Sequence, residues 1–322
     1  MGGERHRTAK IGRHEASVRV LLFGASGQLG SALRRSLMGL GPLVTPSRKQ
    51  CDLTRPGQLR LWVREVRPDI IVNAAAYTAV EKAQHDPLPA LAINAQAPEV
   101  LADEAARLGA LLVHYSTDYV FDGAKLSPYE EDDVPGPLNH YGQTKWWGEQ
   151  ALAASEARFL IFRTSGLYGP NRRNFVKTLM AKAGREAVVP VVADQWAGPT
   201  PAAWVAEATA AILLRYQGEQ QRGEDPAAPF PYGTFHMAVS GQTSWFEFAT
   251  EVLAAVHYLG RMMPHVQGRL QAIEMQQLGA SVQRPAYSVL STQKLQAQFG
   301  LTPPEWKAAL YKTLERGPWP IV

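Results

Sequence analysis

The chain has 322 residues, of which 46% are hydrophobic and 19% charged, and its formal net charge is +4. This length and composition suit one large or two unequal globular domains. The single cysteine, Cys51, excludes an internal disulfide framework and a cysteine-rich metal site. We see neither an apolar run of membrane-spanning length nor a basic stripe with interleaved aromatic residues. We therefore expect a soluble cytoplasmic protein, monomer or homodimer, that binds neither membrane nor nucleic acid.

The first 17 residues are rich in glycine, histidine and basic residues and contain no apolar core of a secretory signal. This composition predicts a flexible basic tail over residues 1–17. A nucleic-acid-binding arm is the alternative, but no basic stripe continues into the body of the chain.

Short apolar runs then alternate with stretches of helical periodicity. The expected strands span residues 18–23, 42–46, 69–75, 110–116 and 159–164. The expected helices span residues 29–40, 58–66, 89–108 and 141–154. This alternation predicts an α/β fold, a doubly wound parallel sheet of the Rossmann type with helices on both faces.

The alternation changes after Tyr168. We expect a helix over residues 175–182, a strand over 188–192, a helix over 202–216, a polar loop over 217–231, a strand over 233–238 and a helix over 245–259. The chain thus divides into a dinucleotide-binding domain, residues 18–170, and a smaller C-terminal substrate lobe, residues 171–322. We expect this lobe to be interleaved with the last strands of the sheet.

A glycine-rich turn follows the first expected strand, with the spacing G-x-x-G-x-x-G. Its residues are Gly24, Ser26, Gly27, Gln28, Leu29 and Gly30. At the start of a helix, such a turn lets the backbone approach a diphosphate closely. An ordinary tight turn would look similar, but the position after the first strand favours cofactor binding.

The loop after the second expected strand bears on the choice of cofactor. Arg48 and Lys49 stand where a ribose 2′-phosphate would lie, and no carboxylate ends the strand to hold a 2′-hydroxyl. This favours NADPH, with NADH possible, although a solvated turn has the same composition. Asp52 and Leu53 are expected beside the adenine, with Asp52 as a hydrogen-bond acceptor; a turn or N-cap role is the alternative for Asp52.

Small residues follow the expected strand 69–75, at Ala74, Ala75 and Ala76, and Tyr77 comes next. Small side chains at this edge let a cofactor pass over the sheet, although they equally suit tight strand–helix packing. Asn94 lies in an otherwise apolar helical stretch, and a buried amide needs polar partners. We count all five residues as candidate cofactor contacts.

Thr117, Tyr141 and Lys145 are the candidate catalytic residues. Tyr141 and Lys145 are four residues apart on an expected helix and so lie on one face. The ammonium is expected to favour ionisation of the phenol and to lower its pKa, which suits proton transfer. Thr117 follows the expected strand 110–116. Three unrelated surface residues remain the alternative; Tyr141 and Lys145 also count as cofactor contacts.

Several longer segments together resemble one family, the extended short-chain dehydrogenase/reductases, and within it the dTDP-4-dehydrorhamnose reductases. The resemblance spans about residues 18 to 314 and includes LLFGASGQLG (21–30), NAAAYTAVEKA (73–83), STDYVFDG (116–123), PLNHYGQTKWWGE (137–149) and RPAYSVLSTQKL (284–295). It implies NAD(P)H-dependent reduction of the 4-keto group of a dTDP-linked 6-deoxysugar, foremost dTDP-4-dehydro-L-rhamnose. It also implies that Thr117 and Tyr141 bind the keto oxygen and that Lys145 holds the nicotinamide ribose.

The resemblance further implies a set of substrate contacts. These are Val80, Glu81, Thr117, Asp118, Tyr119, Asn174 and Arg284. Two departures from the family pattern carry expectations. Ala32 replaces a glutamate that belongs to a metal site in some members, so we expect no metal. Gly166 replaces a tryptophan near the sugar, so we expect a missing aromatic contact unless Trp196 or Trp146 supplies it.

Two other functions stay open at this point. One is a non-catalytic, NADP-binding regulatory subunit similar to the beta subunit of methionine adenosyltransferase, which resembles this family. The other is a reductase for a different dTDP-4-keto deoxysugar. Oxidation of NADPH in the presence of a keto sugar distinguishes a reductase from the regulatory subunit. Turnover of a panel of dTDP-4-keto sugars distinguishes a reductase for dTDP-4-dehydro-L-rhamnose from a reductase for another deoxysugar.

Overall fold

The computed structural model describes residues 18–223, 229–260, 269–279, 281–317 and 319. The expected basic tail, residues 1–17, and part of the expected loop 217–231 lie outside the described residues.

A six-stranded sheet forms the centre of the molecule, and every pair of neighbouring strands in it is parallel. Its order is β2 (Leu43–Val44), β1 (Val20–Phe23), β3 (Ile70–Asn73), β4 (Leu111–Thr117), β5 (Arg158–Thr164) and β8 (Gly233–His236). β2 lies on one side of β1, and β3 and the later strands lie on the other side, so the chain winds outwards from β1 in both directions. This topology confirms the expected doubly wound α/β fold.

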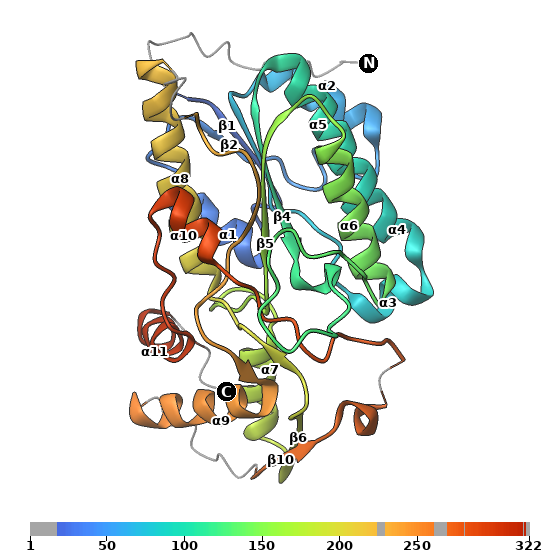
Figure 1. The fold of residues 1–322 in the computed structure, drawn as a ribbon, viewed down its shortest axis with the longest axis vertical. Coiled ribbons are helices and arrows are strands. Elements are labelled where there is room, and N and C mark those ends of the chain that lie inside the picture. The colour runs from blue at the N-terminus through green and yellow to red at the C-terminus, as the bar shows by residue number, and fades with distance from the viewer. Residues whose placement is uncertain (1–17, 224–228, 261–268, 280, 318, 320–322) are drawn as a thin grey trace, which may run out of the picture.

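Helices cover both faces of the sheet because alternate residues of each strand point to opposite sides. In β1, Val20 and Leu22 pack in one core with α1 (Gln28–Ser36) and α8 (Ala202–Arg222). Leu21 and Phe23 pack in the other core with α2 (Pro56–Val66) and α5 (Ala97–Leu108), and α6 (His140–Ala153) lies beside α5. Figure 1 shows these two layers on either side of the strands.

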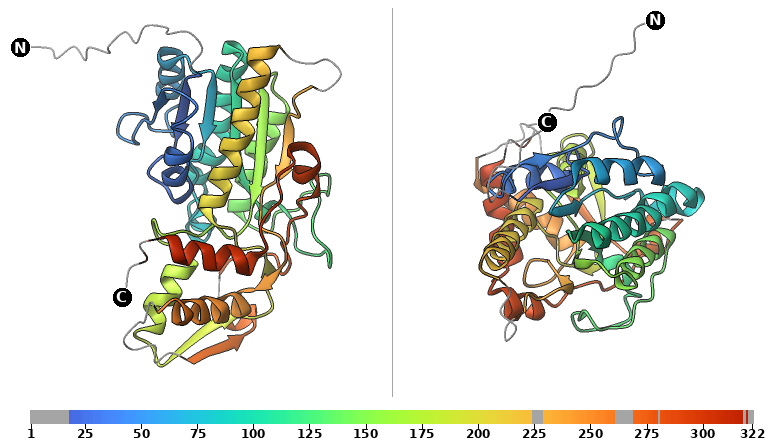
Figure 2. Two further views of the ribbon diagram at one scale, coloured as in Figure 1. Left: turned by 90° about the vertical axis from the view of Figure 1, so that its left-hand side faces the viewer. Right: turned by 90° about the horizontal axis from the view of Figure 1, so that it is seen from above.

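A smaller lobe lies below the carboxyl ends of the strands (Figures 1 and 2). It contains α7 (Phe175–Ala183), β6 (Val188–Val192), α9 (Trp245–Tyr258), β10 (Arg269–Ile273) and α11 (Trp306–Arg316). β6 pairs with β10, and an apolar core separate from those of the sheet holds the helices together. α8 and β8 return to the large sheet between these elements, so the chain passes between the lobe and the sheet more than once.

The expected helix over residues 89–108 is interrupted. α4 (Pro87–Leu91) leads into a π-helical turn, Ala92–Gln96, before α5. Pro98 has no N–H to continue the regular ladder, which accounts for the irregular turn before it.

One other expectation about the elements is wrong, and several elements were not expected. α8 continues to Arg222, so residues 217–222 are helical rather than a loop, and the pair Arg215–Glu219 bridges one turn of this extension. Six elements were not expected from the sequence: β10, α11, α3 (Val80–His85), α10 (Gln293–Phe299), and the short pair β7 (Trp196–Ala197) and β9 (Thr243–Ser244). All of them except α11 are too short to show a clear period.

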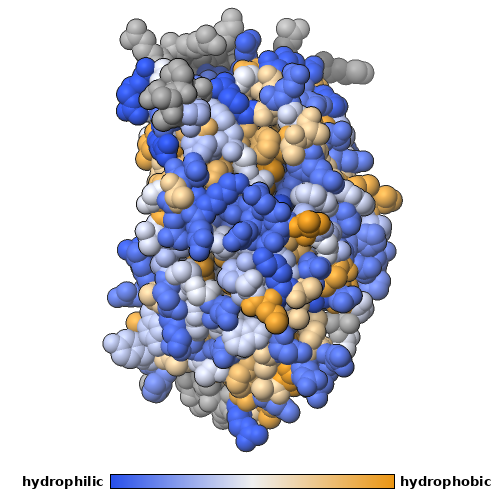
Figure 3. All heavy atoms as spheres, in the orientation of Figure 1, coloured by the Kyte–Doolittle hydropathy of each residue, from blue (hydrophilic) through white to orange (hydrophobic). Residues whose placement is uncertain are grey.

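In the described part of the chain, no helix is both long and apolar enough to cross a membrane. On the face seen in Figure 3, hydrophobic residues are dispersed among hydrophilic ones. Scattered apolar residues of this kind are normal for protein surfaces.

Candidate active site

The main cavity, about 840 Å³, opens at the carboxyl ends of the strands and reaches from the glycine turn to Tyr141 and Lys145. A smaller cavity of about 190 Å³ adjoins it and is lined by residues of both lobes. Five residues line both cavities: Thr78, Thr117, Asp118, Tyr141 and Gly166. This position, beside the point where the strand order reverses, is where doubly wound folds bind ligands.

The glycine turn is tight enough to exclude side chains. Gly24 has φ +77°, and a Cβ there would lie 2.5 Å from the backbone nitrogen of Ala75. A Cβ on Gly30 would lie 2.0 Å from the carbonyl oxygen of Gly24. No side chain caps the N-terminus of α1. The turn therefore offers free N–H groups and the positive end of the helix dipole to an anion, which fits the diphosphate of a dinucleotide.

Most candidate cofactor residues line the main cavity. They are Gly24, Ser26, Gly27, Gln28, Leu29, Arg48, Asp52, Leu53, Ala74, Ala75, Ala76, Tyr141 and Lys145. Gly30, Tyr77 and Asn94 are not among the residues that line it. The amide of Asn94 instead binds the backbone N–H and carbonyl of Tyr77 and the hydroxyl of Thr144. These bonds fasten the segment after β3 to α6 and thereby shape the cavity wall.

Asp52 stabilises a turn, which the sequence left open as the alternative to an adenine contact. Its carboxylate accepts hydrogen bonds from the backbone N–H and hydroxyl of Thr54, and the backbone bond holds its pKa below the usual range. Asp52 still lines the cavity, so an adenine contact remains compatible with this turn. Three arginines of the cavity wall were not among the cofactor residues predicted from the sequence: Arg34, Arg172 and Arg173.

The three candidate catalytic residues meet where the two cavities join. Thr117 ends β4, and Tyr141 and Lys145 lie one turn apart on the buried side of α6. Asn139 caps this helix by accepting a hydrogen bond from the backbone N–H of Gly142. The ammonium of Lys145 donates to the carbonyl oxygen of Tyr115, and its Nζ lies 3.2 Å from Nε2 of His114.

The expected lowering of the Tyr141 pKa is wrong for this structure. Burial raises the pKa of Tyr141 to about 12, and a hydrogen bond with Thr117 opposes the rise only in part. Lys145 contacts His114 and Tyr115, and burial lowers the pKa of Lys145 itself to about 8. His114 is also buried, and its pKa lies well below the usual value, so its ring is neutral. A raised pKa keeps Tyr141 protonated at neutral pH, as a proton donor must be.

Asp118 is a buried carboxyl group that holds the site together. It accepts hydrogen bonds from the hydroxyls of Thr117 (3.1 Å), Ser165 (2.8 Å) and Ser288 (2.6 Å). Burial raises its pKa, while these hydroxyls oppose the rise. Asp118 therefore ties the end of β4 to the loop after β5 and to the C-terminal segment.

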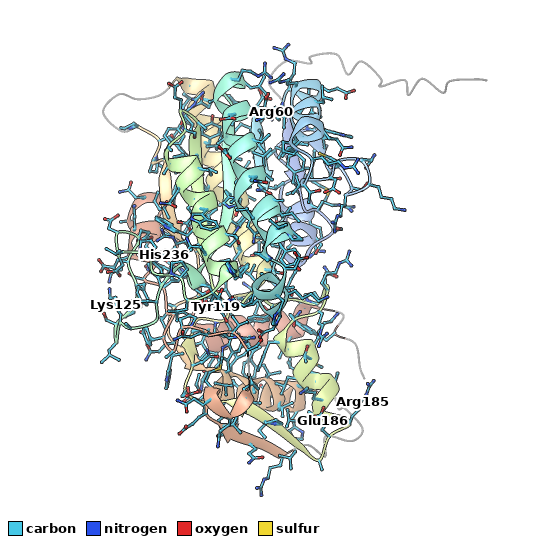
Figure 4. The ribbon with its side chains drawn as sticks, turned by 90° about the vertical axis from the view of Figure 1, so that its right-hand side faces the viewer. Arg60, Tyr119, Lys125, Arg185, Glu186 and His236 are labelled. Carbon is cyan, nitrogen blue, oxygen red and sulfur yellow. The ribbon has the colours of Figure 1, made fainter. Side chains whose placement is uncertain are left out.

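The smaller cavity has aromatic walls from both lobes. Tyr119 packs edge-on against Tyr141, with ring centroids 6.0 Å apart, and Figure 4 shows Tyr119 at the junction of the lobes. Trp196 and Trp245 line the same cavity, from a part of the chain other than that of Tyr119 and Tyr141. A Cβ on Gly166 would lie 3.1 Å from Cη2 of Trp245.

The sequence left open whether another tryptophan replaces the ring missing at Gly166, and both Trp196 and Trp245 line this cavity. Trp245 occupies this place, and it was not named in the sequence as a replacement. Trp146 packs in a different apolar cluster, around Phe121. Indole faces are suited to packing against the apolar face of a pyranose, so the sugar end has an aromatic wall despite the glycine.

The remaining substrate candidates lie in different places. Val80 lines the smaller cavity. Glu81 and Arg284 form an ion pair with each other and line neither cavity. Asn174 caps α7, lines the main cavity and donates a hydrogen bond to the side-chain oxygen of Gln28. The structure thus brings Asn174 to the cofactor turn.

Comparison with known proteins identifies the relatives of this chain. The family model described as the RmlD substrate binding domain matches residues 18–317. A dTDP-4-dehydrorhamnose reductase of Burkholderia thailandensis is 40% identical over 293 residues, which cover 91% of this chain and 97% of the relative. The reductase of the same name from Escherichia coli K12 is 38% identical over 299 residues, covering 92% and 96%.

A solved structure is similar over nearly the same range. The dTDP-4-dehydrorhamnose reductase of Bacillus anthracis, solved in complex with NADP, superimposes with a TM-score of 0.81 at 32% identity. The match covers 92% of this chain and 99% of that protein.

Proposed function

The chain belongs to the dTDP-4-dehydrorhamnose reductase family, and from this we propose that it reduces the 4-keto group of dTDP-4-dehydro-L-rhamnose to give dTDP-L-rhamnose. The cofactor is NADPH, with NADH as a possible substitute; the similar Bacillus anthracis reductase was solved with NADP. Since NADPH and nucleotide sugars are cytoplasmic metabolites, we propose that the protein works there.

One observation carries this proposal. Thr117, Tyr141 and Lys145 meet at the junction of a dinucleotide-sized cleft and a small, aromatic-walled cavity. Tyr141 donates a proton to the C4 oxygen as negative charge develops there, and the hydroxyl of Thr117 orients that oxygen. Lys145 provides positive charge near the site and binds the ribose of the cofactor. Bound NADPH supplies the hydride for C4.

The reaction should slow at alkaline pH because Lys145 loses its charge. Its pKa is lowered to about 8 by burial, so it is protonated below that pH and neutral above it. His114 stays neutral and Tyr141 protonated across this range. We expect kcat/KM, which reports on the free enzyme, to fall as pH rises through about 8. A Lys145→Met variant should have lower activity without this step, whereas a wild-type profile flat to pH 10 would contradict the role of Lys145.

The choice of cofactor should depend on Arg48. It lines the cleft, and the one acidic lining residue that interacts with it, Asp52, already accepts hydrogen bonds from Thr54. We expect NADPH to bind more tightly than NADH, and Arg48→Ala to weaken NADPH about tenfold while leaving NADH unchanged. The preference should narrow with salt because Arg48 is exposed. Lys49→Ala is the matched control, since Lys49 is exposed but does not line the cleft. Equal affinities for the two cofactors at low salt would contradict this prediction.

The identity of the sugar is tested with a panel of dTDP-4-keto-6-deoxysugars, each given to the purified chain with NADPH. We expect kcat/KM to be highest for dTDP-4-dehydro-L-rhamnose. Turnover of another sugar in preference to it would assign the chain to a different deoxysugar. Binding of NADPH without oxidation by any sugar in the panel would favour the regulatory-subunit alternative.

A further inference from the structure

The loop between β5 and α7 crosses the start of α1. Three of its side chains bond to the glycine turn and first helical residues: Asn171 Nδ2 to Ser31 Oγ (3.1 Å), Arg172 Nε to Ser26 O (2.7 Å) and Asn174 Nδ2 to Gln28 Oε1 (2.8 Å). These contacts join residues about 140 positions apart in the chain. They place the loop beside the free N–H groups at which we propose that a diphosphate binds.

Arg172 has an unusual backbone for a residue with a side chain. Its φ is +62°, in the left-handed region that favours glycine. Among the described residues other than glycine, only Arg67 shares a positive φ, and Arg67 ends α2, where that conformation is common. Strained conformations of this kind persist where the surrounding contacts hold them, and they gather at ligand sites.

The guanidinium of Arg172 is oriented but not neutralised. Its Nε donates to the carbonyl of Ser26, and neither Arg172 nor Arg173 forms an ion pair with an acidic group in the described part of the chain. Both are exposed and line the main cavity. A planar guanidinium fixed through Nε leaves its terminal nitrogens to donate together to phosphate oxygens.

The charges around the cleft favour an anion at this point. Arg34 and Arg48 also line the cavity, whereas its only acidic lining residues among those described are Asp52 and the buried Asp118. The positive end of the α1 dipole adds to this field at the turn. A diphosphate beside Ser26 would therefore meet backbone N–H groups on one side and Arg172 on the other.

We propose that Arg172 binds the cofactor diphosphate from the side of the β5–α7 loop, opposite the N-terminus of α1. The proposal rests on the NADPH-dependent function above and adds a phosphate ligand outside the glycine turn. The diphosphate of the nucleotide sugar has the same chemistry, but the bond to Ser26 places Arg172 at the cofactor turn.

The test is the Arg172→Gly variant, because glycine accepts a φ of +62° and the substitution removes only the side chain. Dissociation constants for NADPH, NADH and dTDP are measured by calorimetry. NADPH and NADH should both bind at least about tenfold more weakly, since both carry the diphosphate, while dTDP binds as before. Arg172→Lys should recover only part of the loss, because lysine keeps the charge without the planar fork.

The control is Arg185→Ala, which removes one exposed cation just beyond the C-terminal end of α7 (Figure 4). Arg185 lines a third cavity together with Arg172 and Arg173 but does not line the main cavity. It should leave both cofactor affinities unchanged. Urea unfolding should show Arg172→Gly to be as stable as the wild type, so that weak binding is not a folding defect.

Three results would overturn the proposal. Normal affinity of Arg172→Gly for both cofactors would exclude a phosphate contact. Loss of NADPH affinity alone would place the contact at the 2′-phosphate, and loss of dTDP affinity alone would place it at the nucleotide sugar. These binding results are independent of turnover: if the wild type binds NADPH but reduces no keto sugar, the proposed reaction fails and the role of Arg172 stands.

Discussion

Replacing Tyr141 by phenylalanine should lower kcat by at least about 100-fold, the usual cost of losing a general acid. The ring would still pack edge-on against Tyr119, so the cavity keeps its shape. The lost hydroxyl is the proton donor in the proposed reaction, and its raised pKa keeps it protonated at neutral pH. Turnover at saturating keto sugar and NADPH is the measurement.

Two controls make this result specific. The dissociation constant for NADPH should change little in Tyr141→Phe, because the phenol is proposed to act on the sugar oxygen. Tyr258→Phe removes an exposed phenol of α9 and should leave turnover unchanged. Near-normal turnover of Tyr141→Phe would show that another group protonates the product.

A Gly30→Ala substitution should nearly abolish cofactor binding. The added Cβ would stand 2.0 Å from the carbonyl oxygen of Gly24, far inside van der Waals contact, so α1 must move away from the turn. We expect NADPH affinity to fall by more than about 100-fold and the free energy of unfolding to fall by about 1–3 kcal/mol, the usual range for overpacking. Calorimetric titration and urea unfolding measure the two effects.

Gly57→Ala is the matched control. Gly57 lies in the first turn of α2, and no atom lies within 4 Å of the position of an added Cβ. Its φ is outside the left-handed region, so alanine should be neutral or slightly stabilising. Unchanged NADPH binding by Gly30→Ala would mean that the close approach of α1 to Gly24 is not needed for the cofactor.

The alternating pattern of the first half made the sheet predictable. Buried parallel strands such as β3 and β4 are continuous apolar runs, and glycine or proline marks their ends. The type of each element and the order of elements along the chain therefore follow from local composition. The order of the strands also brings Thr117 and the first turn of α6 to one edge. The position of the candidate catalytic residues therefore follows from short-range signals.

Other features depend on contacts between distant residues, which no local pattern contains. Arg172 reaches Ser26 across the cleft, and the two adjacent arginines were the only signal in the sequence. Trp245, the first residue of α9, stands beside Gly166 although the two are far apart in the chain, and this contact is a tertiary property. The pKa values of Tyr141 and Lys145 depend on burial, which a helical spacing of four residues does not reveal.

The most direct test of the account combines the purified chain, NADPH and dTDP-4-dehydro-L-rhamnose in one reaction. NADPH absorbance is followed while the product is identified by NMR. We predict that one NADPH is oxidised for each dTDP-L-rhamnose formed. Binding of NADPH and dTDP without oxidation of the cofactor, under conditions where a known reductase of this family turns over, would contradict the proposed reaction.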